Sequence, residues 1–197
     1  MNPDSAFSSF VFGKRGALLA LPAAGLAAFG KPSAFSIAIG LPLAFAGEVV
    51  RMWAVGYSGV TTRGDVVTAP ALVTAGPYAY VRNPLYVGNF LTAAGFAVAF
   101  TGKNCAPVRL LLVGGSLAAM FGVYAVIVPH EEGYLRATFG QPFDDYCERV
   151  PRVVPALEPS EPQHGSYDPD VIGKAESRTW LTFGAMLGVL ALKALRG

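Results

Sequence analysis

Long apolar runs separated by short polar turns are the dominant pattern along this 197-residue chain. Five apolar runs have lengths of 14 to 23 residues, compared with the about 20 residues that a helix needs to cross a bilayer. They cover residues 16–29, 33–55, 84–100, 108–128 and 179–195. The pattern therefore predicts an all-α integral membrane protein with about five transmembrane helices.

Two polar stretches differ from ordinary turns. The first, residues 57–83, ends at Asn83-Pro84, where Asn83 suits a helix N-cap and Pro84 suits the first helical turn. The second, residues 130–152, is charged and aromatic, with apolar residues spaced i,i+4 on both sides of a Gly140–Pro142 break. We expect the second stretch to form two short amphipathic helices at the membrane surface.

These boundaries predict four parts of the chain: an N-terminal lead (1–15), a membrane-embedded domain (16–152), a polar linker (153–178) and a C-terminal transmembrane helix (179–197). The linker is rich in proline, glutamate and serine, which is typical of a mobile connection. The last helix carries Gly184 and Gly188, a GxxxG spacing that lets two helices approach closely. A homodimer through this helix is therefore one expectation.

Composition supports a membrane protein and excludes several functions. Charged residues make up 14% of the chain, against roughly 25% in an ordinary soluble domain. The mean hydropathy is +0.45. A net charge of +2 without a basic cluster argues against a nucleic-acid partner. We expect no metal site, because His130 beside Glu131-Glu132 lacks the second histidine of a zinc helix.

Positive charges predict the orientation in the membrane. Ten of the fifteen lysines and arginines fall on the side that holds both polar stretches. The positive-inside rule makes that side cytoplasmic, with the N-terminus inside and the C-terminus outside. A site built from two cytoplasmic segments could reach a soluble cofactor and a lipid-borne substrate together.

A series of short motifs follows one another along the chain between residues 47 and 152. They are Gly47-Glu48-x-x-Arg51-x-Trp53-Ala54, Leu72-Val73-x-x-Gly76-Pro77-Tyr78, Arg82-Asn83-Pro84-x-Tyr86-x-Gly88, Glu131-Glu132, Phe139-Gly140, Tyr146 and Val150-Pro151-Arg152. In this order and spacing they resemble the isoprenylcysteine carboxyl methyltransferase and phospholipid methyltransferase superfamily. The resemblance implies a small all-helical membrane enzyme whose membrane-interface loops, rather than a Rossmann sheet, bind S-adenosylmethionine.

The resemblance also implies which residues bind this cofactor. The adenosine is lined by Leu72, Val73 and Tyr78. The cofactor is wrapped, through backbone and ring contacts, by Asn83, Pro84, Leu85 and Tyr86. The ammonium of the methionyl part is bound by the carboxylate of Glu131. These residue types suit a flat adenine and a cationic ammonium.

Residues for substrate binding and catalysis follow from the same motifs. Arg51 and Arg152 are candidates for binding the substrate. Tyr86 and Glu132 are candidates for proton handling if the methyl acceptor is an amine, which must be neutral to react. The expected substrate is lipophilic and membrane-borne: an isoprenoid, a phospholipid or a related small lipid.

The chain departs from the superfamily pattern at two positions. Asn83 stands where the common motif has histidine, and an amide cannot titrate near neutral pH, so Asn83 is not a general base. Ile127 stands where the isoprenylcysteine enzymes place an arginine for the substrate carboxylate. This second departure argues against prenylcysteine as the substrate.

Two other functions remain open from the residues. A nicotinamide-dependent membrane reductase of the sterol or steroid type has a related C-terminal half, although it usually needs a longer chain. A non-enzymatic membrane scaffold would explain the GxxxG helix and the interfacial tyrosines. It would not explain why Glu131-Glu132 accompanies the Gly76–Asn89 stretch.

Overall fold

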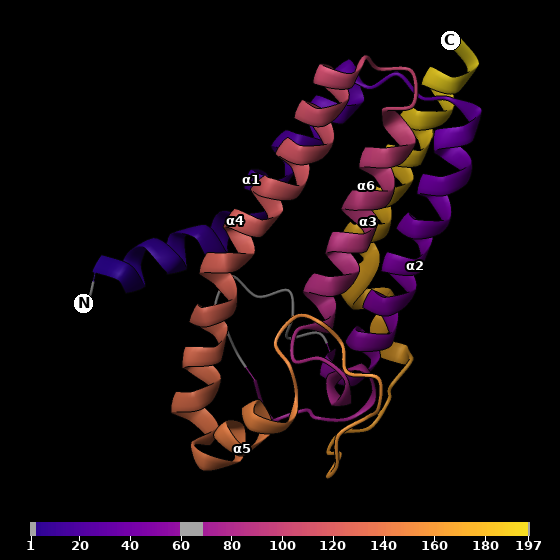
Figure 1. Cartoon of the computed structure of the whole chain (residues 1–197). Helices are drawn as coiled ribbons and strands as arrows, with labels where there is room; N and C mark the ends of the chain where they lie inside the picture. Colours follow the sequence, from indigo (N-terminus) through magenta and orange to yellow (C-terminus); the bar gives the residue numbers. More distant parts are fainter. Residues whose placement is uncertain (1–2, 60–68, 197) are drawn as a thin grey trace. The chain divides into compact units, whose positions relative to one another are not determined.

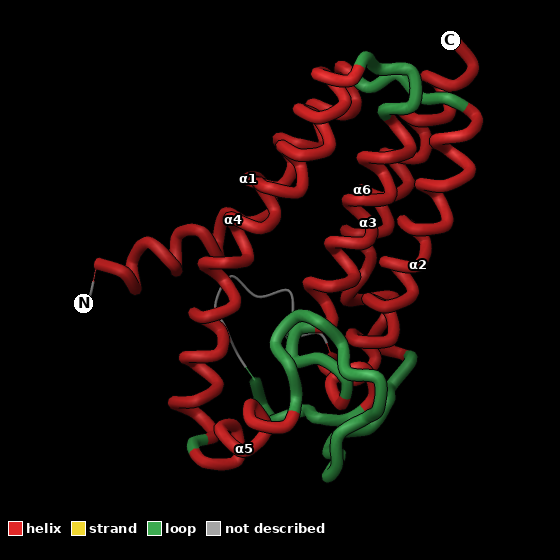
Figure 2. Tube along the Cα trace, in the orientation of Figure 1, coloured by secondary structure: helices red, strands yellow, loops and turns green. Residues whose placement is uncertain are grey.

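The described residues of this computed structural model, 3–59 and 69–196, form helices and loops without strands (Figures 1 and 2). The helices are α1 (Pro3–Phe29), α2 (Ala34–Ser58), α3 (Pro84–Phe100), α4 (Ala106–Phe139), α5 (Gln141–Arg149) and α6 (Asp170–Arg196). A short 3₁₀ helix, η2 (Gly76–Ala79), precedes α3.

The all-α membrane fold predicted from the sequence is confirmed. By length and apolar composition, α1, α2, α4 and α6 are each able to cross a membrane, and α3 is a shorter apolar helix of 17 residues. The predicted bounds of α3, residues 84 and 100, agree with the structure. Pro84 begins the helix because its missing N–H would have no partner in the first turn.

Several predicted boundaries need correction. Residues 130–139 are not a separate amphipathic helix but continue α4, so only α5 forms a short helix of its own in this stretch. α4 ends where Gly140 adopts a φ of 59°, a conformation that is unfavourable for residues with a Cβ atom. α1 begins at Pro3, within the predicted lead, and α6 begins at Asp170, within the predicted linker.

The chain divides into two compact units. The first comprises residues 1–13, 50–87 and 124–176, and the second comprises residues 14–49, 88–123 and 177–197. An apolar cluster of Leu26, Ala44, Phe96, Phe100 and Phe183, among others, forms the core of the second unit. The first unit holds most of the motif residues on which the functional prediction depends, whereas Gly47, Glu48 and Gly88 belong to the second.

Two loops of the first unit lie against each other (Figure 2). We call residues 72–83 the motif loop and residues 153–169 the strap. Strap amides donate backbone hydrogen bonds to the motif loop, from Ala156 to Tyr80 O and from Ser160 to Ala79 O, both 2.9 Å. The strap, predicted as part of a mobile linker, is thus held in place by backbone hydrogen bonds.

Candidate active site

The motif loop is shaped by its own backbone hydrogen bonds. The turn of η2 is closed by the amides of Tyr80 and Val81, which both donate to the carbonyl of Pro77 at 3.2 Å. The carbonyl of Asn83 then accepts the amides of Tyr86 and Val87 at 3.1 and 3.2 Å, which starts α3. The loop therefore enters α3 in a fixed direction.

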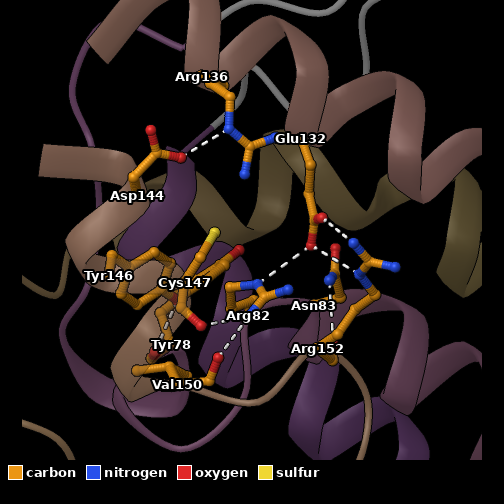
Figure 3. Close-up of polar contacts among 10 residues, drawn as sticks. All are labelled: Tyr78, Arg82, Asn83, Glu132, Arg136, Asp144, Tyr146, Cys147, Val150 and Arg152. Atoms are coloured by element: carbon orange, nitrogen blue, oxygen red, sulfur yellow. Dashed lines mark hydrogen bonds and ion pairs between the residues drawn. The ribbon is translucent and has the colours of Figure 1, made fainter. Parts of the chain in front are cut away.

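Arg82 connects the motif loop to α4 and α5 (Figure 3). Its Nε donates to Glu132 Oε1 at 3.1 Å, and its Nη1 donates to the carbonyls of Cys147 and Val150 at 2.9 and 2.6 Å. Only 11% of the side chain is exposed. The carbonyls at the end of a helix carry partial negative charge, so α5 presents them to a cation favourably.

Glu132 accepts hydrogen bonds from a second guanidinium group as well (Figure 3). Arg152 donates through Nε to Oε1 at 3.1 Å and through Nη2 to Oε2 at 2.6 Å. The Glu132 carboxylate in turn raises the pKa of Arg152. The side chain of Glu132 is 5% exposed, whereas that of Arg152 is 51% exposed, so the guanidinium group of Arg152 is accessible from outside the protein.

The neighbouring carboxylate, Glu131, has a different partner. The Tyr86 hydroxyl donates to Glu131 Oε1 at 2.7 Å, and the Tyr86 ring lies 4.4 Å from the ring of Tyr124. Glu131 and Tyr86 are both partly buried. The arrangement places a carboxylate beside an aromatic pair, which is a suitable environment for a cation.

Two further contacts hold the middle of the motif loop and its last residue (Figure 3). The Asn83 side-chain amide donates to the carbonyl of Arg152 at 3.0 Å, and the Tyr146 hydroxyl donates to the carbonyl of Tyr78 at 2.8 Å. Burial raises the pKa of Tyr78 to about 12 and raises that of Tyr146 as well. Both phenols therefore stay protonated at physiological pH and do not act as bases.

The other residues expected at the cofactor pocket lie in or next to the motif loop. Leu72 packs against an apolar cluster. The cluster consists of Phe143 and Tyr146 in α5 and Val150, which directly follows this helix. Pro84 is buried, and Leu85 and Val73 are partly buried.

Arg51 belongs to a separate ion pair. Its Nη2 donates to both oxygens of Glu176 in α6, at 2.8 and 2.9 Å. The side chains are 9% and 0% exposed. The charge of Arg51 is thus compensated inside the protein, whereas Arg152, the other candidate for substrate binding, is half exposed.

Comparison with known proteins identifies the family. The sequence model described as "Phospholipid methyltransferase" matches residues 35–142, more than half of the chain. The chain belongs to the phospholipid methyltransferase family. This confirms the superfamily predicted from the motifs. No solved structure matches the chain.

Curated relatives support the same family. Protein-S-isoprenylcysteine O-methyltransferase B of Arabidopsis thaliana is 28% identical over 59% of this chain and 57% of its own length. The isoprenylcysteine O-methyltransferase of Xenopus laevis is 32% identical over 61% of this chain and 41% of its own length. The nickel-cobalt-cadmium resistance protein NccN of Alcaligenes xylosoxydans xylosoxydans is 34% identical over 44% of this chain and 37% of its own length. The matches thus span between a third and three fifths of these relatives.

Three features of the site were missed from the sequence. Arg82 was part of a quoted family motif, but its role as a junction depends on contacts 50 to 68 residues away. Glu176 had no local signal as the partner of Arg51. The strap had no sequence signal either, because a composition rich in proline and glutamate is typical of a linker. The strap also lies beyond residues 35–142, which match the family.

Proposed function

We propose that this family member is an S-adenosylmethionine-dependent membrane methyltransferase that acts on a lipophilic, membrane-borne substrate from the cytoplasmic face. One observation carries the proposal: the stretch Arg82–Tyr86 and the pair Glu131-Glu132, far apart in sequence, contact each other. The contacts are the Tyr86–Glu131 hydrogen bond of 2.7 Å and the Arg82–Glu132 ion pair of 3.1 Å.

The side chains around these contacts fit the cofactor. Glu131 supplies a carboxylate for an ammonium group, and the tilted ring pair of Tyr86 and Tyr124 supplies an aromatic wall beside it. Leu72 and Val73 supply apolar surface for an adenine. When bound there, S-adenosylmethionine would supply an electrophilic methyl group on a sulfonium.

The roles of the two carboxylates differ in this proposal. Glu131 binds the cofactor, and the Tyr86 hydroxyl orients it. Glu132 lies between two guanidinium groups, which stabilise its ionised form and suit it to positioning rather than to proton transfer. Tyr86 then remains the candidate for proton handling at an amine. Holding the reacting groups in position is the main contribution that an enzyme makes to such a displacement.

The proposed substrate class rests on the membrane helices and on Arg152. A lipid substrate can approach from the bilayer beside apolar helices, while the half-exposed guanidinium of Arg152 can bind an anionic group of the substrate. The curated relatives named above include two that act on protein S-isoprenylcysteine by name. This chain has a buried Ile127 in place of the expected arginine, so we propose an isoprenoid, phospholipid or related lipid.

A label-transfer assay tests the proposal. Membranes that contain the protein are incubated with S-adenosylmethionine labelled in its methyl group, and label extracted into organic solvent is counted. We expect label with the parent protein and a large loss with Glu131→Gln. Label released by mild base would indicate a carboxylate acceptor, and base-stable label an amine or a thiol. Equal label in parent and variant membranes would overturn the proposal.

A further inference from the structure

The strap covers the part of the motif loop that is expected to bind adenosine. Residues 161–169 of the strap are themselves exposed, whereas Thr74 and Ala75 beneath them are only 4% and 6% exposed. The amides of Thr74 and Ala75 both donate to the carbonyl of His164, at 2.9 and 3.1 Å. The strap therefore protects this end of the motif loop from solvent.

The Thr74 hydroxyl makes the cover specific to this register. Its oxygen donates to the carbonyl of Pro162 at 3.2 Å and accepts the amide of His164 at 2.9 Å. Together with its backbone amide, which donates to His164 O, Thr74 thus makes three hydrogen bonds to two strap residues, Pro162 and His164. Loss of this hydroxyl alone would leave a carbonyl and an amide of the strap without their partner.

Gly165 brings the strap against Val73. A Cβ atom built on Gly165 would lie 3.2 Å from Val73 Cγ1, and Gly165 has a φ of 121°, which L-residues rarely adopt. A side chain here would push the strap away from Val73. Glycine therefore permits both the backbone conformation and the close approach.

The strap is also anchored at its far end. The amide of Asp168 donates to the carbonyl of Gly56 at 2.8 Å, and the ring of Tyr167 packs on Gly56 and lies 5.5 Å from the ring of Tyr57. Bonds at both ends and in the middle describe a fixed cover rather than a free linker. This is more than a connection between Arg152 and α6 would require.

We propose that residues 162–165 of the strap form one wall of the adenosine end of the cofactor pocket, with Thr74 and Gly165 as positioning residues. The inference rests on the proposed function and extends it, because the strap lies outside the segment that matches the family, residues 35–142. The cofactor site of this chain then includes a segment that the family motifs do not contain.

Binding of S-adenosylhomocysteine to the purified full-length protein tests the inference. Thr74→Val and Gly165→Ala should each raise the Kd by about tenfold, ~1.4 kcal/mol. The matched controls are Thr182→Val, whose hydroxyl bonds only a carbonyl of its own helix, and Gly173→Ala, which has open space around it. Both controls should bind as the parent does.

A second ligand separates the two ends of the pocket. 5′-Methylthioadenosine contains the adenosine but lacks the amino-acid part, and its affinity is measured by competition with S-adenosylhomocysteine. Thr74→Val should weaken both ligands by the same factor, whereas Glu131→Gln should weaken S-adenosylhomocysteine alone. A general loss of stability would not distinguish the ligands in this way. A Thr74→Val variant that weakens only S-adenosylhomocysteine would overturn the inference.

Hydrogen exchange on the parent protein needs no variant to fold. S-adenosylhomocysteine should slow exchange in residues 160–166 as well as in residues 76–86. Protection of residues 76–86 alone, or unchanged affinity in both strap variants, would overturn the role of the strap while leaving the proposed function intact. A folded parent that binds no S-adenosylhomocysteine would overturn the proposed function itself.

Discussion

Replacement of Arg82 by methionine is the most informative perturbation of the site. Methionine keeps much of the apolar stem but removes the three hydrogen bonds to Glu132, Cys147 O and Val150 O. Hydrogen bonds to charged groups contribute about 1.5–3 kcal/mol each, and breaking a buried ion pair costs about 3–5 kcal/mol. Because Arg152 still compensates Glu132, the loss comes mainly from the two hydrogen bonds to the carbonyls, and we expect about 3–5 kcal/mol in total.

Thermal unfolding in detergent, followed by circular dichroism, measures this loss. For a domain of this size the expected change lowers the Tm by about 6–20 °C. Arg136→Met is the matched control, because the Arg136–Asp144 pair is exposed on both sides and exposed pairs contribute little to stability. Equal shifts in the two variants would refute the view that Arg82 is the junction of the site.

Three further predictions follow from individual contacts. Tyr86→Phe removes only the hydroxyl that donates a hydrogen bond to Glu131, so the Kd for S-adenosylhomocysteine should rise about tenfold. Calorimetry measures this change, and an unchanged Kd would argue that the hydrogen bond does not orient the carboxylate. Glu176→Gln removes one carboxylate of a buried ion pair with Arg51, so the protein should lose about 3–5 kcal/mol in thermal unfolding. Arg51→Met with Glu176→Leu should recover most of this loss, and a Glu176→Gln variant as stable as the parent would contradict the buried pair. The pKa of Tyr78, raised to about 12, predicts that the folded protein loses stability as the pH rises from about 10 to 12, because the unfolded state releases the Tyr78 proton at lower pH. Ultraviolet difference titration of the parent against Tyr78→Phe should show that Tyr78 ionises near pH 12. Ionisation of Tyr78 near pH 10 would contradict this prediction.

The sequence predicted what depends on local pattern. The apolar runs predicted the membrane helices because a helix satisfies its polar backbone groups by internal hydrogen bonds. A run of about 20 apolar side chains is then sufficient to place it in lipid. Pro84 predicted the start of α3 because its effect acts within one helical turn. Family membership was predictable because several short motifs occur in a fixed order.

What the sequence did not predict depends on distant contacts. Arg51 and Glu176 are 125 residues apart, and no periodicity relates them. From the sequence, Glu132 was one of two candidates for proton handling at an amine, and nothing local indicates that Arg82 and Arg152 converge on it. The strap is held largely by backbone hydrogen bonds, which composition does not encode.

The central claim, a cofactor site at the contact between the motif loop and α4, is tested most directly by calorimetric titration with S-adenosylhomocysteine. The parent protein, Glu131→Gln and Tyr78→Ala are compared, with reduced nicotinamide as an alternative ligand. Our account predicts binding in the parent, a large loss in both variants and no binding of nicotinamide. A folded parent that binds nicotinamide but not S-adenosylhomocysteine would contradict it and favour a reductase.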